Sequence, residues 1–207
     1  MRHVETLESR MLLSASAMPA ALTSQVVMSP TTSYQLDRRG TLQIKATGNL
    51  YAKVASVTGP GNVEVQLADD TGATADLPGV SLVAILETGS GGQMIAWQVS
   101  GVNASIYARG AADNVFVDDL GNDHTTVVVD GAGSSVFFDG SGFAQAFATG
   151  SPTTNNDTLV VNGSFTVTTG GFDTLAQNGS GPAATVLGVK RTTAMTRLRS
   201  LFTKLHH

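Results

Sequence analysis

The sequence predicts an all-β protein built as a right-handed parallel β-helix, or β-solenoid, with an amphipathic helix at its C-terminus. Three observations favour this fold class. Charged residues make up only 14% of the chain and glycine accounts for 23 of 207 residues, whereas ordinary globular domains are roughly 25% charged. Short β-branched runs recur between Gly, Asp and Asn clusters, which is typical of many short strands. One stretch also repeats with a nine-residue period, as stacked coils do.

Residues 1–15 are interpreted as an export segment. Residues 7–13 read LESRMLL and are followed by Ser-Ala. This stretch resembles the LEPR-XLL segment at the N-terminus of large exported proteins of planctomycete-type bacteria, with Ser9 in place of the family's proline. The resemblance implies export or placement at the cell surface. A plain amphipathic helix is the competing interpretation, and Glu5 and Glu8 disfavour an ordinary secretory signal.

Residues 16–40 are expected to be a linker with at most one short strand, because Pro19 and Pro30 interrupt a Ser-, Thr- and Ala-rich stretch. Residues 41–189 form the predicted β-rich domain. Its expected strands are the runs TLQIK (41–45), LYAKVASV (50–57), NVEVQL (62–67), VSLVAIL (80–86), MIAWQV (94–99), ASIYA (104–108), NVFV (114–117), TTVVV (125–129), SSVFF (134–138), TLVV (158–161), SFTVTT (164–169) and ATVLGV (184–189).

The nine-residue repeat consists of TTVVVDGAG (125–133) followed by SSVFFDGSG (134–142). It resembles the coils of calcium-binding nonapeptide rolls. The glycine and apolar places of that pattern are filled by Gly131, Gly133 and Phe137. The ligand aspartate is replaced by Ser135, and by Ala144 in the next unit, while Asp157 and Asp173 keep it in later units. The repeat is therefore degenerate.

Turn signals support a rival fold. Asp130-Gly131, Asp139-Gly140 and Asn162-Gly163 lie between β-rich runs, and Asn-Gly and Asp-Gly are strong hairpin signals. Residues 158–169 could thus form an antiparallel hairpin. Because solenoid corners need the same residue types, an antiparallel β-sandwich remains the alternative fold.

Residues 190–207 form a basic amphipathic tail. Apolar side chains recur at three- to four-residue spacing, which predicts a helix; they are Met195, Leu198, Leu201, Phe202 and Leu205. The tail is expected to cover an open end of the solenoid. A membrane-surface helix and a contact with an acidic neighbour are the alternatives.

Charge is distributed unevenly along the chain. Residues 46–189 carry two basic and thirteen acidic residues, whereas residues 190–207 carry five basic residues and no acidic one. The acidic body disfavours nucleic-acid binding. The absence of cysteine excludes disulfides and thiolate chemistry, and no apolar run approaches the roughly 18 residues of a transmembrane segment.

Metal binding is weighed against turn capping. Asp69-Asp70, Asp118-Asp119 and residues 155–157 could supply oxygen ligands for calcium. The preferred interpretation is that these side chains cap turns by bonding nearby backbone groups. No metal ligand is assigned, and calcium remains a possible cofactor.

One catalytic constellation is conceivable. Arg109 lies near Asp113, Asp118 and Asp119 in the sequence, and their convergence in a groove lined by Trp97 or Tyr107 would favour an enzyme. Otherwise they are ordinary surface charges. His124 is expected at an exposed turn. No catalytic or cofactor-binding residue is assigned, and the chain is not expected to be an enzyme.

The sequence therefore predicts an extracellular or surface-located, non-enzymatic structural or adhesive module. Its expected partners are cell-surface carbohydrate or envelope components. A carbohydrate-active β-helix enzyme, such as a polysaccharide lyase or hydrolase, and a calcium-stabilised β-roll are the alternatives. The oligomeric state is left open.

Overall fold

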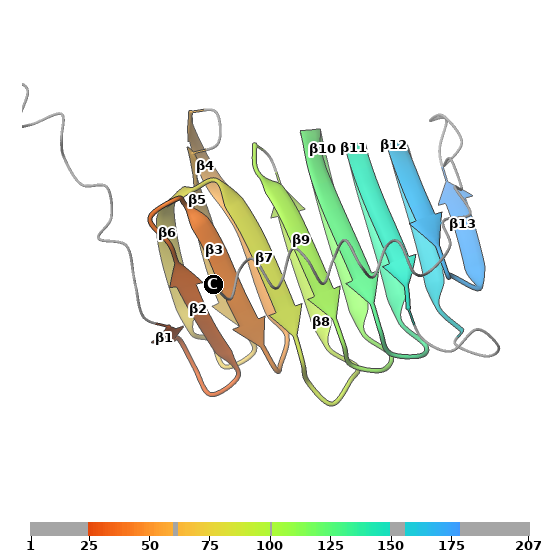
Figure 1. Cartoon of the computed structure of the whole chain (residues 1–207), viewed down its shortest axis with the longest axis horizontal. Helices are drawn as coiled ribbons and strands as arrows, with labels where there is room; N and C mark the ends of the chain where they lie inside the picture. The colour runs from red at the N-terminus through yellow and green to blue at the C-terminus, as the bar shows by residue number, and fades with distance from the viewer. Residues whose placement is uncertain (1–24, 60–61, 100, 150–155, 179–207) are drawn as a thin grey trace, which may run out of the picture.

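The computed structural model describes residues 25–59, 62–99, 101–149 and 156–178. Within these ranges the protein is all-β and contains no helix (Figure 1). Its thirteen strands are β1 (Val26–Val27), β2 (Thr32–Leu36), β3 (Thr41–Ala46), β4 (Leu50–Gly59), β5 (Asn62–Asp69), β6 (Thr74–Val80), β7 (Leu82–Glu87), β8 (Met94–Val99), β9 (Asn103–Ala108), β10 (Asn114–Val129), β11 (Ser135–Ala148), β12 (Thr158–Gly170) and β13 (Thr174–Asn178).

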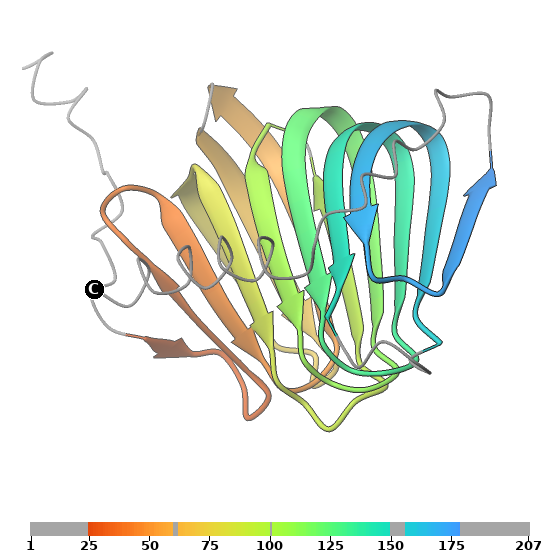
Figure 2. The ribbon, with the colours of Figure 1, turned by 45° about the vertical axis from the view of Figure 1, so that its right-hand side comes forward.

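The chain winds into a β-solenoid of about four turns, in which parallel strands stack along two walls. We call sheet I the wall formed by β3, β7, β9 and the second halves of β10, β11 and β12. Sheet II is the wall formed by β4, β8, β13 and the first halves of β10, β11 and β12. Figure 2 shows the long strands arching from one wall to the other.

The three longest strands each belong to both sheets. In β10, residues 114–119 pair with β8 and residues 125–129 pair with β9. The alternative hairpin over residues 158–169 is therefore wrong, because Asn162-Gly163 lies inside β12, whose two halves both pair in parallel with β11. Gly163 has φ of 89°, which lets the backbone bend into the other sheet rather than reverse its direction.

One full coil takes about twenty residues. Asn114 pairs with Ser135, 21 positions later, and Ser135 pairs with Thr158, 23 positions later. The nine-residue repeat therefore measures half a coil, since residues 125–129 lie in sheet I and residues 135–138 lie in sheet II.

The core consists of apolar columns that run along the solenoid. Pairing in register aligns the inward residues of successive strands, and each buried aliphatic side chain contributes about 1.5–3 kcal/mol. The column of sheet I comprises Ile44, Ile85, Ile106 and Val127, and that of sheet II comprises Leu50, Ile95, Val115, Val136 and Leu159. All are at most 1% exposed and belong to one hydrophobic cluster.

Antiparallel strands occupy the N-terminal end. β1 pairs with β2, β2 pairs with β3, and β5 and β6 extend sheet II beyond β4. Leu36, Val65 and Leu77 from these strands join the same core. The predicted linker over residues 16–40 thus contains two strands that belong to the β-domain, and β6 was not expected at all because Asp76 and Pro78 interrupt its apolar pattern. At the other end, Leu175 of β13 is 44% exposed.

Three expected elements lie outside the described residues. They are the LEPR-XLL-like segment over residues 1–15, the strand at residues 184–189 and the amphipathic tail over residues 190–207. Among the residues that the structure describes, no helix is long and apolar enough to cross a lipid bilayer.

Replacing Gly163 by alanine tests the stacked corners. A Cβ at Gly163 would lie 2.1 Å from the Gly140 carbonyl oxygen of the preceding coil, whereas a Cβ at Gly72, with a similar φ of 82°, meets nothing within 4 Å. Gly72→Ala should cost about 1 kcal/mol through backbone strain alone. Gly163→Ala should cost about 2–4 kcal/mol because overpacking adds to that strain. Denaturant unfolding of both variants measures the difference, and equal losses would contradict close stacking at this corner.

Candidate functional site

An apolar row crosses the outer face of sheet II. Strand register places Tyr51 beside Ala96, Ala96 beside Phe116, and Phe116 beside Phe137. The rings of Phe116 and Phe137 stack in parallel, with centroids 4.7 Å apart and planes 6° apart. Tyr51 is 41% exposed and Phe116 39% exposed. The row therefore presents partly exposed aromatic rings to solvent in a line perpendicular to the strands.

A polar row runs beside it, two residues further along each of these parallel strands. Side chains two residues apart in a strand share one face of a sheet. The successive cross-strand partners in this row are Lys53, Gln98, Asp118, Asp139 and Asn162. The Gln98 Nε2 donates a hydrogen bond of 3.3 Å to Asp118 Oδ2, so neighbouring members of the row hold one another in place.

The two rows meet in a groove of about 690 Å³ that spans β6, β5, β4, β8 and β10. Tyr51 and Phe116 supply its aromatic surface. Its polar side chains are Lys53, Gln66, Asp76, Gln98, Thr74 and Asp118. Both carboxylates lie on the outermost strands of the groove, since Asp76 belongs to β6 and Asp118 to β10.

This combination is suited to a ligand with apolar faces and many hydroxyl groups. Exposed aromatic rings offer flat apolar surface at low conformational cost. Glutamine amides both donate and accept hydrogen bonds, and carboxylates accept them. A few polar groups around an apolar floor are the usual make-up of a small-molecule site. A sugar ring has this complementary character, with C–H groups on its faces and hydroxyls at its edge.

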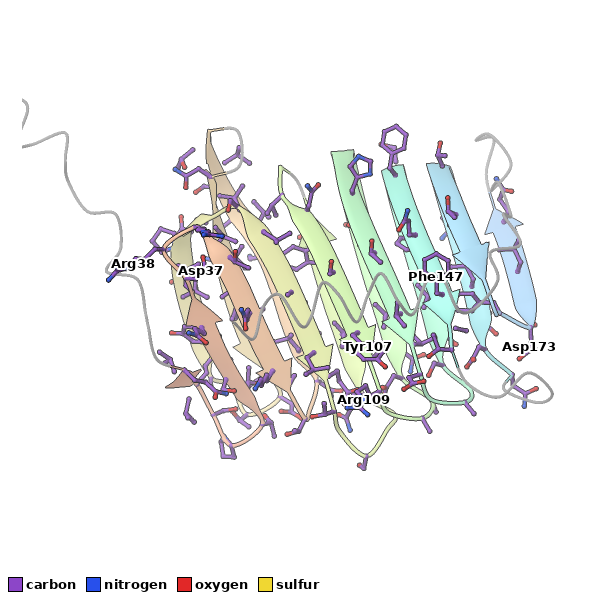
Figure 3. All side chains as sticks on the ribbon, viewed as in Figure 1. Asp37, Arg38, Tyr107, Arg109, Phe147 and Asp173 are labelled. Atoms are coloured by element: carbon purple, nitrogen blue, oxygen red, sulfur yellow. The ribbon has the colours of Figure 1, made fainter. Side chains whose placement is uncertain are left out.

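The structure does not bring together the residues considered as a possible catalytic constellation. Arg109 follows β9 in sheet I, where its guanidinium carbon lies 6.0 Å from the centroid of the Tyr107 ring (Figure 3). Asp118 lies in the groove on sheet II, and Asp113 is fully buried. The side chain of Asp119 lies outside the described part of the structure. The three described side chains thus occupy two walls and a buried corner.

The two aromatic residues expected beside that constellation also occupy different places. Trp97 is 1% exposed and belongs to the core beneath the groove, whereas Tyr107 lies on the outer face of sheet I. His124 is exposed, as expected, but it lies within β10, where its ring stacks on Phe143 with centroids 5.1 Å apart.

Asp113 belongs to a column of polar residues at the corner that leads from sheet I into sheet II. Four residues that each precede a sheet II strand accept a hydrogen bond from the backbone N–H of the equivalent residue one coil earlier. The Gln93 N–H donates to Asp113 Oδ1 (3.0 Å), the Asp113 N–H to Ser134 Oγ (3.3 Å), the Ser134 N–H to Asp157 Oδ1 (2.9 Å) and the Asp157 N–H to Asp173 Oδ2 (3.2 Å). The column satisfies backbone donors that the corner would otherwise bury without partners.

The column shows that the nine-residue repeat was aligned incorrectly with the pattern of calcium-binding nonapeptide rolls. Ser134, not Ser135, occupies the place of Asp113 and Asp157. Val136 fills the inward apolar place, while Phe137 points outward and stacks on Phe116. The sequence alignment was one residue out of register because the glycine positions were matched instead of the buried side chains.

A buried acidic pair stands beside the column. Glu87 and Asp113 are both fully buried, and Glu87 accepts hydrogen bonds from the backbone N–H groups of Gly89, Arg109 and Gly110. Burial, followed by the hydrogen bond to the Glu87 carboxyl, raises the pKa of Asp113 to about 7. The proton held by Asp113 relieves repulsion between the two carboxyl groups.

The aspartate pairs considered as calcium ligands are explained in part by turn capping. The Asp69 Oδ1 accepts from the Thr71 N–H (3.0 Å), the Thr71 hydroxyl (2.6 Å) and the Ala73 N–H (3.2 Å), and its Oδ2 accepts from Ser29 Oγ (2.5 Å). Burial opposes ionisation of this carboxyl, but the hydrogen bonds from Ser29 and Thr71 prevail and lower the pKa of Asp69 to about 2. Asp157 belongs to the polar column, and Asn155 lies outside the described residues.

Comparisons of the chain with protein-family models, with curated proteins and with solved structures find no match.

Asparagine at position 113 should change how stability depends on pH. A carboxyl whose folded-state pKa is raised contributes stability that is complete below its unfolded pKa of about 3.8 and is lost as pH rises towards 7. Asp113→Asn should therefore match the wild type near pH 4 and exceed it by about 1–4 kcal/mol above pH 7. Urea unfolding between pH 4 and pH 8 measures this, with Asp139→Asn on the outer face as the control. A constant offset across that range would refute the assignment.

Chelation of calcium should leave stability unchanged. The Asp69 oxygens are already held by hydroxyl and backbone donors, and the Asp157 and Asp173 carboxylates each bond the corner of the preceding coil. We expect the same melting midpoint in excess EDTA and in millimolar calcium. A midpoint that rises with calcium would instead support the calcium-stabilised roll.

Proposed function

We propose that this chain is an exported, non-enzymatic β-solenoid module that adheres to polysaccharide through the groove on sheet II. The observation that carries the proposal is the alignment of Tyr51, Ala96 and Phe116 beside the polar row of Lys53, Gln98 and Asp118. Export rests on the LEPR-XLL-like segment, and a location outside the cell follows from it.

The shape of the groove favours a polymer over a small metabolite. It is an open groove across five strands rather than an enclosed cavity, so it can receive part of a longer chain. Both rows continue beyond the groove, through Phe137 and Asp139 of β11 to Val160 and Asn162 of β12. Strand spacing of about 4.8 Å sets the repeat of these side chains. A linear glycan lying along the solenoid axis can therefore use several rungs at once.

The charge of the surface on sheet II indicates which class of glycan it can bind. The groove and the two rows contain three carboxylates, Asp76, Asp118 and Asp139, and one basic side chain, Lys53. The surface is therefore negative on balance. Such a surface repels polyuronates and other polyanions. We expect neutral or amino-substituted sugars to bind in preference.

A carbohydrate-active enzyme is the second candidate, and one observation favours it. The groove contains two carboxylates on opposite strands at its edges, Asp76 and Asp118, and glycoside hydrolysis uses a pair of carboxylates. The catalytic role would then fall to these residues and not to Arg109. The adhesive function is preferred because Asp118 is engaged by Gln98 in a repeating row and not isolated as a catalytic acid.

Two finer features of the fold belong with the proposal. We infer that the coils are right-handed, since parallel crossover connections have this hand in about 98% of cases. The predicted C-terminal helix completes the module.

Binding assays on immobilised glycans test the adhesive function. The wild type should bind at least one of cellohexaose, xylohexaose and chitohexaose more tightly than oligogalacturonate. Phe116→Ala and Tyr51→Ala should each weaken binding about tenfold, which corresponds to about 1.4 kcal/mol, because each removes an aromatic contact. The matched control is Phe143→Ala, which alters another exposed phenylalanine, 45% exposed, away from the groove.

Failure of all three neutral glycans to bind, or an equal loss in Phe143→Ala, would contradict the adhesive function. The enzyme is tested in the same preparations. Release of new sugar ends that is abolished by Asp76→Asn or Asp118→Asn while binding persists would replace adhesion with catalysis.

A further inference from the structure

The outer face of sheet I carries an apolar stripe that differs from the rows on sheet II. Cross-strand register aligns Leu86 of β7, Tyr107 of β9, Val128 of β10 and Phe147 of β11. Tyr107 and Phe147 both lie on this side of the molecule (Figure 3). The Tyr107 hydroxyl donates a hydrogen bond of 3.1 Å to Asp130 Oδ2, which fixes one ring of the stripe.

Half of the stripe is buried although it points away from the core, and Leu86 and Tyr107 are half-buried. Val128 is 1% exposed and Phe147 9% exposed, and neighbouring Ala84, also outward by register, is 5% exposed. The equivalent apolar row on sheet II leaves Phe116 39% exposed. Figure 2 shows none of the coloured strands over this face of sheet I. Burial at this level requires a covering layer from elsewhere in the chain.

We propose that residues 190–207 form an amphipathic helix that lies along this stripe and covers it. The apolar residues of that segment run from Met195 to Leu205, a rise of about 15 Å at 1.5 Å per residue. From Leu86 to Phe147 the stripe crosses three strand intervals, or about 14 Å at about 4.8 Å each. The two apolar edges therefore match in length when the helix axis is perpendicular to the strands.

Reach and charge support the same occupant. The described chain ends at Asn178 in the last strand of sheet II, and residues 179–189 can extend up to about 36 Å, well beyond the roughly 10 Å that separates packed sheets. The tail carries five basic residues and no acidic one, whereas residues 46–189 carry thirteen acidic residues and two basic ones. This site differs from the open solenoid end to which the sequence alone assigned the tail.

Thiol labelling tests the proposal, because the chain contains no cysteine. Val128→Cys reports on the stripe, Phe147→Cys is a second reporter, and Gln145→Cys, exposed on the same sheet face, is the reactive control. In the full chain, the Val128→Cys thiol should react with a soluble disulfide reagent at least about tenfold more slowly than the Gln145→Cys thiol. Adding Leu198→Asp and Phe202→Asp should remove that protection, while Arg199→Gln should preserve it.

Several results would overturn the proposal. The Val128→Cys and Phe147→Cys thiols could be unprotected in the full chain, or their protection could survive both the double substitution Leu198→Asp/Phe202→Asp and the deletion of residues 190–207. Protection could instead be lost only when residues 1–24 are deleted, or it could depend on protein concentration. The last two would assign the cover to the N-terminal segment or to a second copy. Far-UV circular dichroism confirms that each variant keeps its β-structure, and glycan binding by the groove provides an independent readout on the other sheet.

Discussion

The spacing between hydrogen-bonded parallel strands is the constraint on which the rest of the structure depends. Each coil lies about 4.8 Å from the next, so every residue meets the residue that occupies the same place in the neighbouring coil. Each side chain must therefore fit the side chains at the same position in the coils before and after it, and these positions form columns along the solenoid. The columns of this protein include an aliphatic one through Ile44, Ile85 and Ile106 and an aromatic pair of Phe116 and Phe137.

Corners are where this constraint is most severe, because the backbone leaves the sheet and its polar groups lose their regular partners. Two devices meet it here. Glycine is needed where carbonyl oxygens of adjacent coils approach closely, as at Gly131, where a Cβ would lie 2.0 Å from the Gly110 oxygen. Short polar side chains, such as Asp113, Ser134 and Asp157, accept the N–H groups of the coil before them. The acidic residues of the body thus serve the fold at one corner and line the groove on sheet II.

The same stacking gives the two outer faces different chemical character. On sheet II, outward residues alternate between a partly exposed apolar row with aromatic rings and a row of mainly amides and carboxylates, and the two rows line the groove. On sheet I, the outward row of Leu86, Tyr107, Val128 and Phe147 is apolar, with Val128 and Phe147 buried and the other two half-buried. One wall is therefore suited to contact with a partner and the other to contact with the rest of the chain.

The sequence by itself determined the all-β class and most strand positions, because β-branched runs bounded by glycine and small polar residues favour strands whatever they pair with. MIAWQV coincides with β8, and LYAKVASV lies within β4. Its local signals could not decide what Asn162-Gly163 does, since the same positive φ serves a hairpin or a solenoid corner. The parallel pairing of both halves of β12 with β11 shows that Asn162-Gly163 forms a solenoid corner. Only long-range pairing, which joins Ala96 of β8 to Phe116 across 20 positions and to Tyr51 across 45, placed Tyr51 and Phe116 on either side of Ala96. The same pairing buried Asp113 beside Glu87 and separated Arg109 from Asp118.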